Sequence, residues 1–201
     1  MRPAVRIVLT GIVVLLAAEA AAHAQSITSF DPPGSVKTGA SSINSAGEVT
    51  GSYTDGVNIV HGFIRDAGGT FTTFDPPGGR INDAGAVTGC CFYDAVGRYY
   101  GFIRDAGGTI TSFGVPGAHG TAPASINNAG VVTGSYYPYE QGATSHGFIR
   151  DAGGTITSFD VPGSTATWPD AINDTGAVTG QYNDRVTGHG FIRDGGYHHQ
   201  L

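Results

Sequence analysis

A short pattern recurs four times along this chain, and such internal repetition restricts the fold more strongly than any other feature of the sequence. The pattern has three parts in a fixed order. They are Ile-Asn-x-x-Gly-x-Val-Thr-Gly, then Gly-Phe-Ile-Arg-Asp, then a Thr/Ser-Phe segment that ends in Pro-Gly. The second part begins at Gly62, Gly101, Gly147 and Gly190, so its copies lie 39, 46 and 43 residues apart. Four copies of one unit therefore account for most of the chain.

Each copy consists of strand and turn signals. Val-Thr-Gly-x-Tyr and Gly-Phe-Ile-Arg combine β-branched and aromatic residues in runs of strand length. Asn-Asp-Ala-Gly at 82–85 and Asp-Ala-Gly-Gly at 105–108 have the residues that tight hairpin turns require. Pro-Gly ends a strand because proline has no N–H to donate into a ladder. No stretch after residue 24 has helical periodicity, so we predict an all-β fold.

The strands of one copy are predicted around Ser-Ile-Asn, Val-Thr-Gly-x-Tyr, Gly-Phe-Ile-Arg and Thr-x-Thr-Ser-Phe, in that order. Four-stranded units of about 40–50 residues are typical of β-propellers. The chain after residue 24 starts with a lone strand of the fourth type, at 27–34, and ends after one of the third type, at 190–194. We predict a small β-propeller of about four four-stranded blades, closed by pairing of the N-terminal strand with the last blade. An open β-solenoid would gain nothing from these complementary ends.

The N-terminal segment has the features of a secretory signal. Two arginines precede an uncharged apolar run of 12 residues, 7–18, which is shorter than the ~20 residues that span a bilayer. Residues 22–24 read Ala-His-Ala, the small-x-small pattern of a signal-peptidase site. We predict a signal peptide at 1–24 and a single repeat domain at 25–201. The mature chain is expected to have no membrane span and to be extracellular or periplasmic.

Charge and cysteine content exclude further classes. Without residues 1–24 the chain loses two arginines and one glutamate, so its net charge becomes −7 instead of −6. No basic stripe is present to neutralise phosphates, which argues against nucleic acid as a partner. Cys90 and Cys91 are adjacent, and neighbouring Cα atoms lie about 3.8 Å apart, below the roughly 4.4–6.8 Å usual for disulfides. We expect no intrachain disulfide, no metal, no other cofactor and a monomer.

The combination of HGFIRD, Ile-Asn-x-x-Gly-x-Val-Thr-Gly and Phe-Asp-x-Pro-Gly resembles the HAF family of bacterial extracellular repeat proteins. The resemblance covers residues 27–194, with Tyr100 in place of histidine in the second copy and Gly114 in place of aspartate in the third. It implies a secreted or surface-located, β-rich protein of unassigned biochemical activity. It assigns no catalytic residue.

Function is expected in the segments that differ between copies. A meander places its connections at alternating ends of the sheet, so the nearly constant turns share one face and the variable loops share the other. Loops on a rigid scaffold usually carry function, and aromatic rings beside a few polar groups suit stacking against sugar rings or gripping a peptide. The candidate ligand-binding residues are Arg98, Tyr99, Tyr136, Tyr137, Tyr139, Glu140, Trp168 and Arg185. The alternative is that these rings pack locally over loop backbone.

The repeated polar residues are expected to be structural. His61, His146 and His189 share one position in the copies, and hydrogen bonding is favoured for them over a converging metal site. The repeated Arg-Asp step is expected to hydrogen-bond turns and neighbouring blades. The aspartates of the Phe-Asp-x-Pro-Gly segments lack the dense oxygen-ligand spacing of a calcium loop.

The predicted function is that of a non-catalytic binding or interaction module, secreted or surface-located, with a glycan or a surface protein as its ligand. The alternative is a polysaccharide hydrolase or lyase on a propeller scaffold, with a carboxylate pair drawn from Asp94, Asp170 and Asp184. We expect no enzyme activity, because no serine–histidine or cysteine–histidine motif is evident. A structural remnant of a longer repeat array is a third possibility.

Overall fold

The computed structural model describes residues 26–139 and 144–195. The chain divides after Phe30 into two units, and residues 26–30 of the first unit form neither helix nor strand. The second unit is built from strands joined by turns, which confirms the all-β class. The predicted signal peptide lies outside the described residues. Within them, no helix is long and apolar enough to span a membrane.

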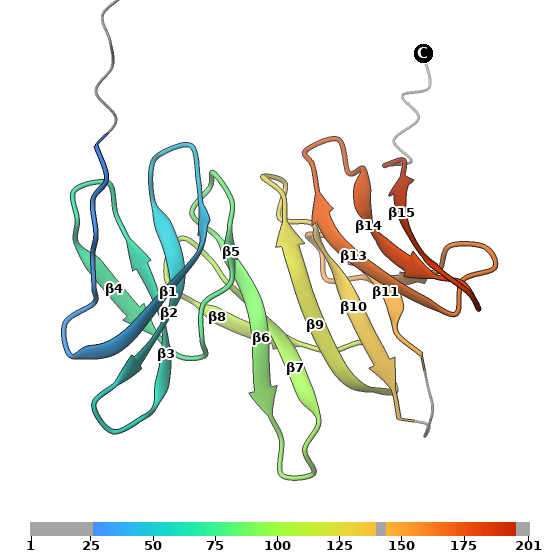
Figure 1. Cartoon of the computed structure of the whole chain (residues 1–201), viewed down its shortest axis with the longest axis horizontal. Coiled ribbons are helices and arrows are strands. Elements are labelled where there is room, and N and C mark those ends of the chain that lie inside the picture. The colour runs from blue at the N-terminus through green and yellow to red at the C-terminus, as the bar shows by residue number, and fades with distance from the viewer. Residues whose placement is uncertain (1–25, 140–143, 196–201) are drawn as a thin grey trace, which may run out of the picture. The chain divides into compact units, whose positions relative to one another are not determined.

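The strands of the second unit follow one another as antiparallel meanders (Figure 1). The first meander contains β1 (Ser35–Ile43), β2 (Val49–Asp55), β3 (Val60–Arg65) and β4 (Phe71–Phe74). The second contains β5 (Arg80–Ile81), β6 (Val87–Tyr93), β7 (Tyr99–Arg104) and β8 (Ile110–Phe113). The third contains β9 (Ala118–Ile126), β10 (Val132–Pro138), β11 (His146–Arg150) and β12 (Ile156–Phe159). The fourth contains β13 (Ala166–Ile172), β14 (Val178–Asn183) and β15 (Gly188–Arg193).

The nearly constant turns are closed by a side-chain oxygen together with a glycine. In the β1–β2 turn, Asn44 Oδ1 accepts hydrogen bonds from the backbone N–H groups of Ala46 and Glu48, at 3.1 and 2.9 Å. Gly47 in this turn has a φ of 79°, which glycine adopts without steric cost. In the β3–β4 turn, Asp66 Oδ1 accepts a bond of 2.8 Å from the N–H of Thr70. The repeated Asn and Asp therefore decide where each hairpin reverses.

The core forms where successive meanders pack face to face. The phenylalanine of each Gly-Phe-Ile-Arg segment points into it, and Phe63, Phe102 and Phe148 are fully buried. Beyond the first meander, this phenylalanine contacts, edge to face, the last phenylalanine of the preceding meander. The ring pairs are Phe74–Phe102, Phe113–Phe148 and Phe159–Phe191, with centroids 6.2, 6.1 and 6.1 Å apart. Such pairs add specific geometry to the burial of apolar area.

The repeated arginine joins the same contacts. Arg150 lies over the Phe113 ring at 5.0 Å from its centroid, and Arg104 lies over Phe74 at 5.4 Å. Arg150 Nη1 also donates to the carbonyl of Asp151 at 3.2 Å. The Arg-Asp step thus hydrogen-bonds its own turn, as predicted, whereas its contact with the neighbouring meander is a cation–π contact where a hydrogen bond was predicted.

A ladder of asparagine side chains joins the four meanders. Asn44 Nδ2 donates to the carbonyl of Asn82 at 3.1 Å, and Asn82 Nδ2 donates to that of Asn127 at 2.8 Å. Asn127 Nδ2 continues to the carbonyl of Asn173 at 3.0 Å. The asparagine of each Ile-Asn-x-x-Gly segment therefore closes its own turn through oxygen, and in the first three copies it also binds the next meander through nitrogen.

The prediction of a closed four-bladed propeller is wrong. The strands form three open sheets of four, eight and three strands, in a sandwich-like arrangement. A parallel pairing of Tyr99 in β7 with Gly120 in β9 joins the second and third meanders into one sheet. Among the described strands β15 pairs with β14 alone, and residues 26–30, which were expected to complete it, form no strand.

Loop length explains why the hairpins form and the closing pair does not. A short turn brings β4, β8 and β12 directly against the strand that precedes each of them. No short turn joins residues 27–30 to their predicted partner β15, which lies near the other end of the described chain. The entropic cost of loop closure rises with this separation, and face-to-face packing buries the phenylalanines without closure.

A second prediction that fails concerns the cysteines. Cys90 is disulfide-bonded, although no intrachain disulfide was expected. The expectation rested on the short Cα spacing of neighbouring residues, about 3.8 Å across a trans peptide bond. The register of β6 against β7 shifts between Cys90 and Phe92, so β6 is irregular beside the disulfide-bonded residue.

Candidate functional site: an aromatic cluster

Most aromatic rings near the variable loops recur from copy to copy. Tyr53, Tyr136 and Tyr182 occupy one position in β2, β10 and β14, and each packs against the histidine of the following strand. The ring pairs are Tyr53–His61, Tyr136–His146 and Tyr182–His189, with centroids 5.1, 5.2 and 5.0 Å apart. Because the pair is part of the repeated unit, we interpret these rings as architecture.

A second set of rings does not recur, and its members lie together. The Tyr99 centroid lies 6.1 Å from that of Tyr93 at the end of β6 and 6.5 Å from that of Tyr137 in β10. His119 in β9 extends the set, at 6.4 Å from Tyr99 and 5.6 Å from Tyr139. These five residues are here named the aromatic cluster. They come from the variable loops, or from strand ends beside them, in the second and third meanders.

Tyr99 is central because β7 and β9 are parallel neighbours at this point. Its backbone partner is Gly120, and a Cβ added there would clash with the Tyr99 ring, so the ring lies directly over this glycine. Counting back from the isoleucine that ends each first strand, the matching residues are Lys37 in β1 and Ala166 in β13. Both residues have a Cβ, which Gly120 lacks. The space above the backbone that the Tyr99 ring occupies is therefore specific to this copy of the repeat.

The cluster combines exposed rings with a half-buried centre. Tyr93 and Tyr139 are 71% and 68% exposed, whereas Tyr99 is partly covered. Burial, together with the neighbouring phenols of Tyr137 and Tyr93, raises the pKa of Tyr99 above its ordinary value of 10.0. The phenol therefore stays protonated at neutral pH. Uncharged rings of this kind offer flat apolar faces and hydroxyl groups to the same ligand.

No protein-family model, curated protein or solved structure matches this chain. The resemblance to the HAF family stays a prediction. Function is therefore inferred from the geometry of the aromatic cluster and its surroundings.

Three of the eight predicted ligand-binding residues, Tyr99, Tyr137 and Tyr139, belong to the aromatic cluster. Arg98 directly precedes Tyr99 and is exposed, and its Nε lies 3.9 Å from Asp94 Oδ2 in the same loop. This ion pair is worth little in water because both groups are solvated. Arg98 thus supplies a polar group next to the central ring of the cluster.

The other four predicted residues do not join the cluster in the part of the chain that the structure describes. Tyr136 packs on its histidine, as above, so local packing was the correct interpretation for this ring. Trp168 lies half-buried in β13, in backbone register with Gln181 of β14. Arg185 is exposed in the β14–β15 turn. Glu140 lies outside the described residues.

The sequence reasoning missed Tyr93 and His119. A signal for Tyr93 was available, because the residue before the turn aspartate is Thr54 in the first copy and Asn183 in the last. Tyr93 is aromatic where the other two copies have a polar residue, and this departure from the repeat marks it as a candidate. No comparable signal identified His119, which joins the cluster through the pairing of β9 with β7 and β10.

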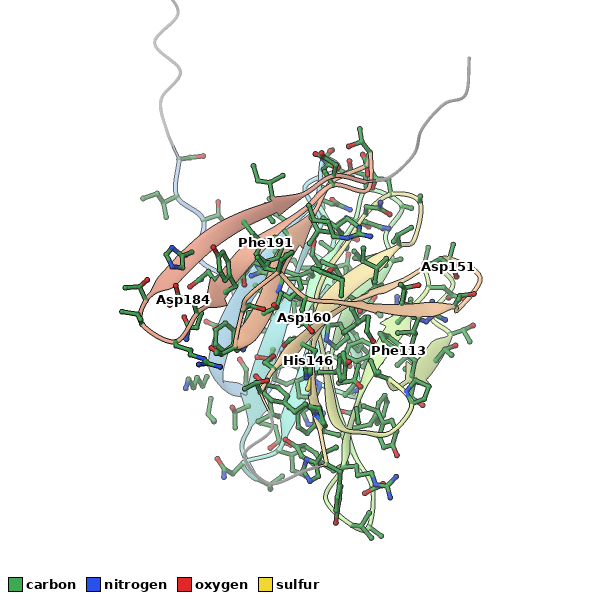
Figure 2. The ribbon with its side chains drawn as sticks, turned by 90° about the vertical axis from the view of Figure 1, so that its right-hand side faces the viewer. Phe113, His146, Asp151, Asp160, Asp184 and Phe191 are labelled. Carbon is green, nitrogen blue, oxygen red and sulfur yellow. The ribbon has the colours of Figure 1, made fainter. Side chains whose placement is uncertain are left out.

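The repeated histidines form hydrogen bonds with aspartates, which confirms the structural role predicted for them. Figure 2 shows His146 beside Asp160. The pairs are His61–Asp75, His146–Asp160 and His189–Asp184, with N···O distances of 2.8, 2.7 and 3.2 Å. No group of three or more His, Cys, Asp or Glu side chains placed to hold a metal ion occurs within residues 26–139 and 144–195.

We expect His61 to titrate above its ordinary pKa of 6.5. Hydrogen bonds to Asp75 and then to Asp55 favour the imidazolium and raise the pKa. The folded state then binds the proton more tightly than the unfolded chain. The stabilising contribution is fully present below pH 6.5 and is lost as the pH rises through the raised pKa.

Titration of the His61 ring followed by NMR spectroscopy checks this expectation. Asp75→Asn should lower the pKa of His61, whereas Asp66→Asn, in the β3–β4 turn, should leave it unchanged. A wild-type pKa at or below 6.5 would contradict the expected direction.

A cavity of about 800 Å³ is a second candidate site, lined by residues of all four meanders. Its charged side chains are Arg80 and Asp170, and both already have partners. Arg80 Nη1 donates to the carbonyl of Ser41, and Asp170 Oδ2 accepts a bond of 3.4 Å from Gln181 Nε2. No aromatic side chain of the described residues lines this cavity, so the aromatic cluster is the stronger candidate for a binding site.

Proposed function

We propose that this protein is a non-catalytic binding module that recognises neutral glycans through the aromatic cluster. The observation that supports this proposal is the contact among rings that are not part of the repeated unit. Repeated rings are explained by the packing of each meander, whereas Tyr93, Tyr99 and Tyr137 have no repeat-wide structural role. The sequence signal at residues 1–24 supports an extracellular or periplasmic location.

The chemistry of the cluster fits sugar rings. The C–H face of a pyranose packs on a tyrosine ring, and the phenol hydroxyl bonds to sugar hydroxyls at its edge. Exposed Tyr93 contacts the half-buried Tyr99, and exposed Tyr139 is connected to it through His119, so an extended ligand can contact several rings at once. The net charge of −6 disfavours polyanionic polysaccharides.

Calorimetric titration tests the proposal, with two neutral ligands: a β-linked hexasaccharide of glucose and a β-linked hexasaccharide of N-acetylglucosamine. Tyr99→Ala and Tyr137→Ala are each expected to weaken binding by about 2 kcal/mol, or roughly 30-fold in Kd, as for central aromatic residues of an interface. Tyr182→Ala is the matched control, because its ring packs on His189 outside the cluster. Affinity that is unchanged in Tyr99→Ala would refute the proposal, and so would the absence of binding by the wild type.

The carboxylates of the variable face support binding without cleavage. A general acid for glycoside hydrolysis needs a raised pKa. Burial alone would raise the pKa of Asp94, but hydrogen bonds from Arg98 N–H, Val96 N–H and the Tyr100 hydroxyl outweigh it, and the pKa is lowered. Hydrogen bonds from the N–H groups of Thr187 and then Val186 likewise lower the pKa of Asp184.

The hydrolase or lyase alternative makes a distinct prediction. Incubation of the protein with the same hexasaccharides, followed by product analysis, is expected to return them intact. Shortened oligosaccharides would replace the binding proposal with a catalytic one.

A further inference from the structure

A repeated β-bulge brings residues of three meanders to the cavity of about 800 Å³. In β1, β9 and β13, the pairing with the following strand skips the residue two places before the final isoleucine, because the register shifts there. The skipped residues are Ser41, Ala124 and Asp170, and all three line the cavity. Bulges are common beside binding and active sites, where they re-aim a side chain. The repeat therefore directs equivalent positions of separate meanders to one place.

Three polar residues that line the cavity differ from their equivalents in the other copies. The equivalents of Asp170 are serine, glycine and alanine, and those of Arg80 are two serines and an alanine. The equivalents of Gln181, which follows Val-Thr-Gly, are two serines and a cysteine. Since the other copies form their meanders with small residues at these positions, the packing of the repeated unit does not require the three larger polar groups.

Arg80 and Asp170 carry opposite charges, and none of the ion pairs among the described residues joins them. Arg80 donates through Nη1 to the Ser41 carbonyl, which uses one of the five N–H groups of its guanidinium. Asp170 accepts one long bond, of 3.4 Å, through Oδ2 from Gln181. Both charged side chains are exposed, so the other guanidinium N–H groups and Asp170 Oδ1 are accessible to a ligand.

We propose that this cavity binds a short peptide with free termini, whose carboxylate pairs with Arg80 and whose ammonium group pairs with Asp170. The guanidinium presents parallel N–H groups that match the two oxygens of a carboxylate, and the aspartate accepts from the N–H groups of an ammonium. Such a ligand carries no net charge, so the net charge of −6 on the chain does not repel it.

The rest of the cavity suits a peptide with small side chains. Its volume lies within the roughly 300–1,000 Å³ of small-molecule sites. Ala40, Gly79 and Ala124 form part of its wall, and they leave space beside the two charged groups. No residue of the aromatic cluster lines the cavity. The peptide site thus goes beyond the proposed function and does not depend on it.

Calorimetric titration of the full-length chain with di-, tri- and tetra-alanine tests the proposal. At least one of these peptides is expected to saturate a single site per chain, and the preferred length reports the separation of the two charges. The same peptide with an acetylated N-terminus or an amidated C-terminus is expected to bind roughly tenfold more weakly, because each change removes one charged contact. Blocking both termini should weaken binding further.

Two variants assign the contacts to the two ends of the peptide. Arg80→Gln is expected to weaken binding of the free peptide roughly tenfold but to leave binding of the C-terminal amide unchanged. Asp170→Asn should weaken binding of the free peptide similarly and leave binding of the N-acetyl peptide unchanged. Arg185→Gln and Asp194→Asn are the matched controls, since both residues are exposed and lie outside the cavity lining.

Three results would overturn the proposal. The first is a wild type that binds none of the free peptides. The second is a doubly blocked peptide that binds the wild type as tightly as the free peptide does. The third is an Arg80→Gln variant that retains the wild-type unfolding midpoint and the wild-type affinity for the free peptide. The comparison of free and blocked peptides uses the wild type alone, so it decides the proposal even if a variant unfolds.

Discussion

Phe148→Ala is expected to lower the free energy of unfolding by about 3–5 kcal/mol, the range for removing a fully buried phenylalanine. The Phe148 side chain has no exposed surface, its strand β11 is paired on both sides, and its ring contacts that of Phe113. The substitution leaves a cavity that the flanking strands prevent from collapsing. Chemical denaturation followed by fluorescence or circular dichroism measures the loss.

Phe191→Ala is the matched control for this substitution. Phe191 occupies the same place in the repeat and makes the same kind of ring contact, with Phe159. It is only half-buried, and its strand β15 has one neighbour among the described strands. We expect a clearly smaller loss of unfolding free energy than for Phe148→Ala, measured by the same chemical denaturation. Equal losses at both positions would mean that the fourth meander is as enclosed as the third, against the open arrangement.

Asn127→Ala is expected to produce the second large loss of stability. Asn127 is buried, donates to the Asn173 carbonyl at 3.0 Å, and accepts from the N–H of Val131 at 2.9 Å. In the alanine variant, the Asn173 carbonyl and the Val131 N–H lose the Asn127 side chain as a hydrogen-bond partner. Each of these groups that stays buried and unsatisfied costs about 1–3 kcal/mol of stability. Thermal and urea unfolding of the variant would record the change.

Asn173→Ala distinguishes the contribution of the turn bonds to stability from that of the bond between meanders. Asn173 closes its own turn by accepting from the N–H groups of Thr175 and Ala177, at 3.1 and 2.9 Å, but its side chain is exposed. The loss is expected to be smaller than for Asn127, because water can replace the bonds at an exposed site. If the two variants are equally unstable, the bond between meanders contributes nothing beyond the turn.

The candidate site was predictable only in part. Its location in the loops that differ between copies followed from the repeat, and Tyr99, Tyr137 and Tyr139 were named on that basis. Which rings meet depends on the parallel pairing of Tyr99 with Gly120, and on the bare backbone that lets the ring lie there. The composition of the loops reveals neither the strand pairing nor the space at Gly120. Tyr136 shows the converse, since its neighbour Tyr137 joins the cluster while Tyr136 faces a histidine.

The sequence by itself determined the strands and the turns, because the forces that form them act over a few residues. Asn44 and Asp66 close hairpins through bonds to backbone groups four residues away, and any chain with these residues at this spacing can make them. The all-β class and the meander order follow directly from such local contacts.

Only the tertiary structure decided whether the meanders close. Closure requires residues 27–30 to find β15 across the whole domain, against a loop entropy that local hairpins do not face. Burial of the phenylalanines between successive meanders proceeds without it, as the Phe113–Phe148 contact shows. The same kind of long-range pairing, that of β7 with β9, assembled the aromatic cluster. Contacts between distant strands therefore set both the open fold and the candidate site.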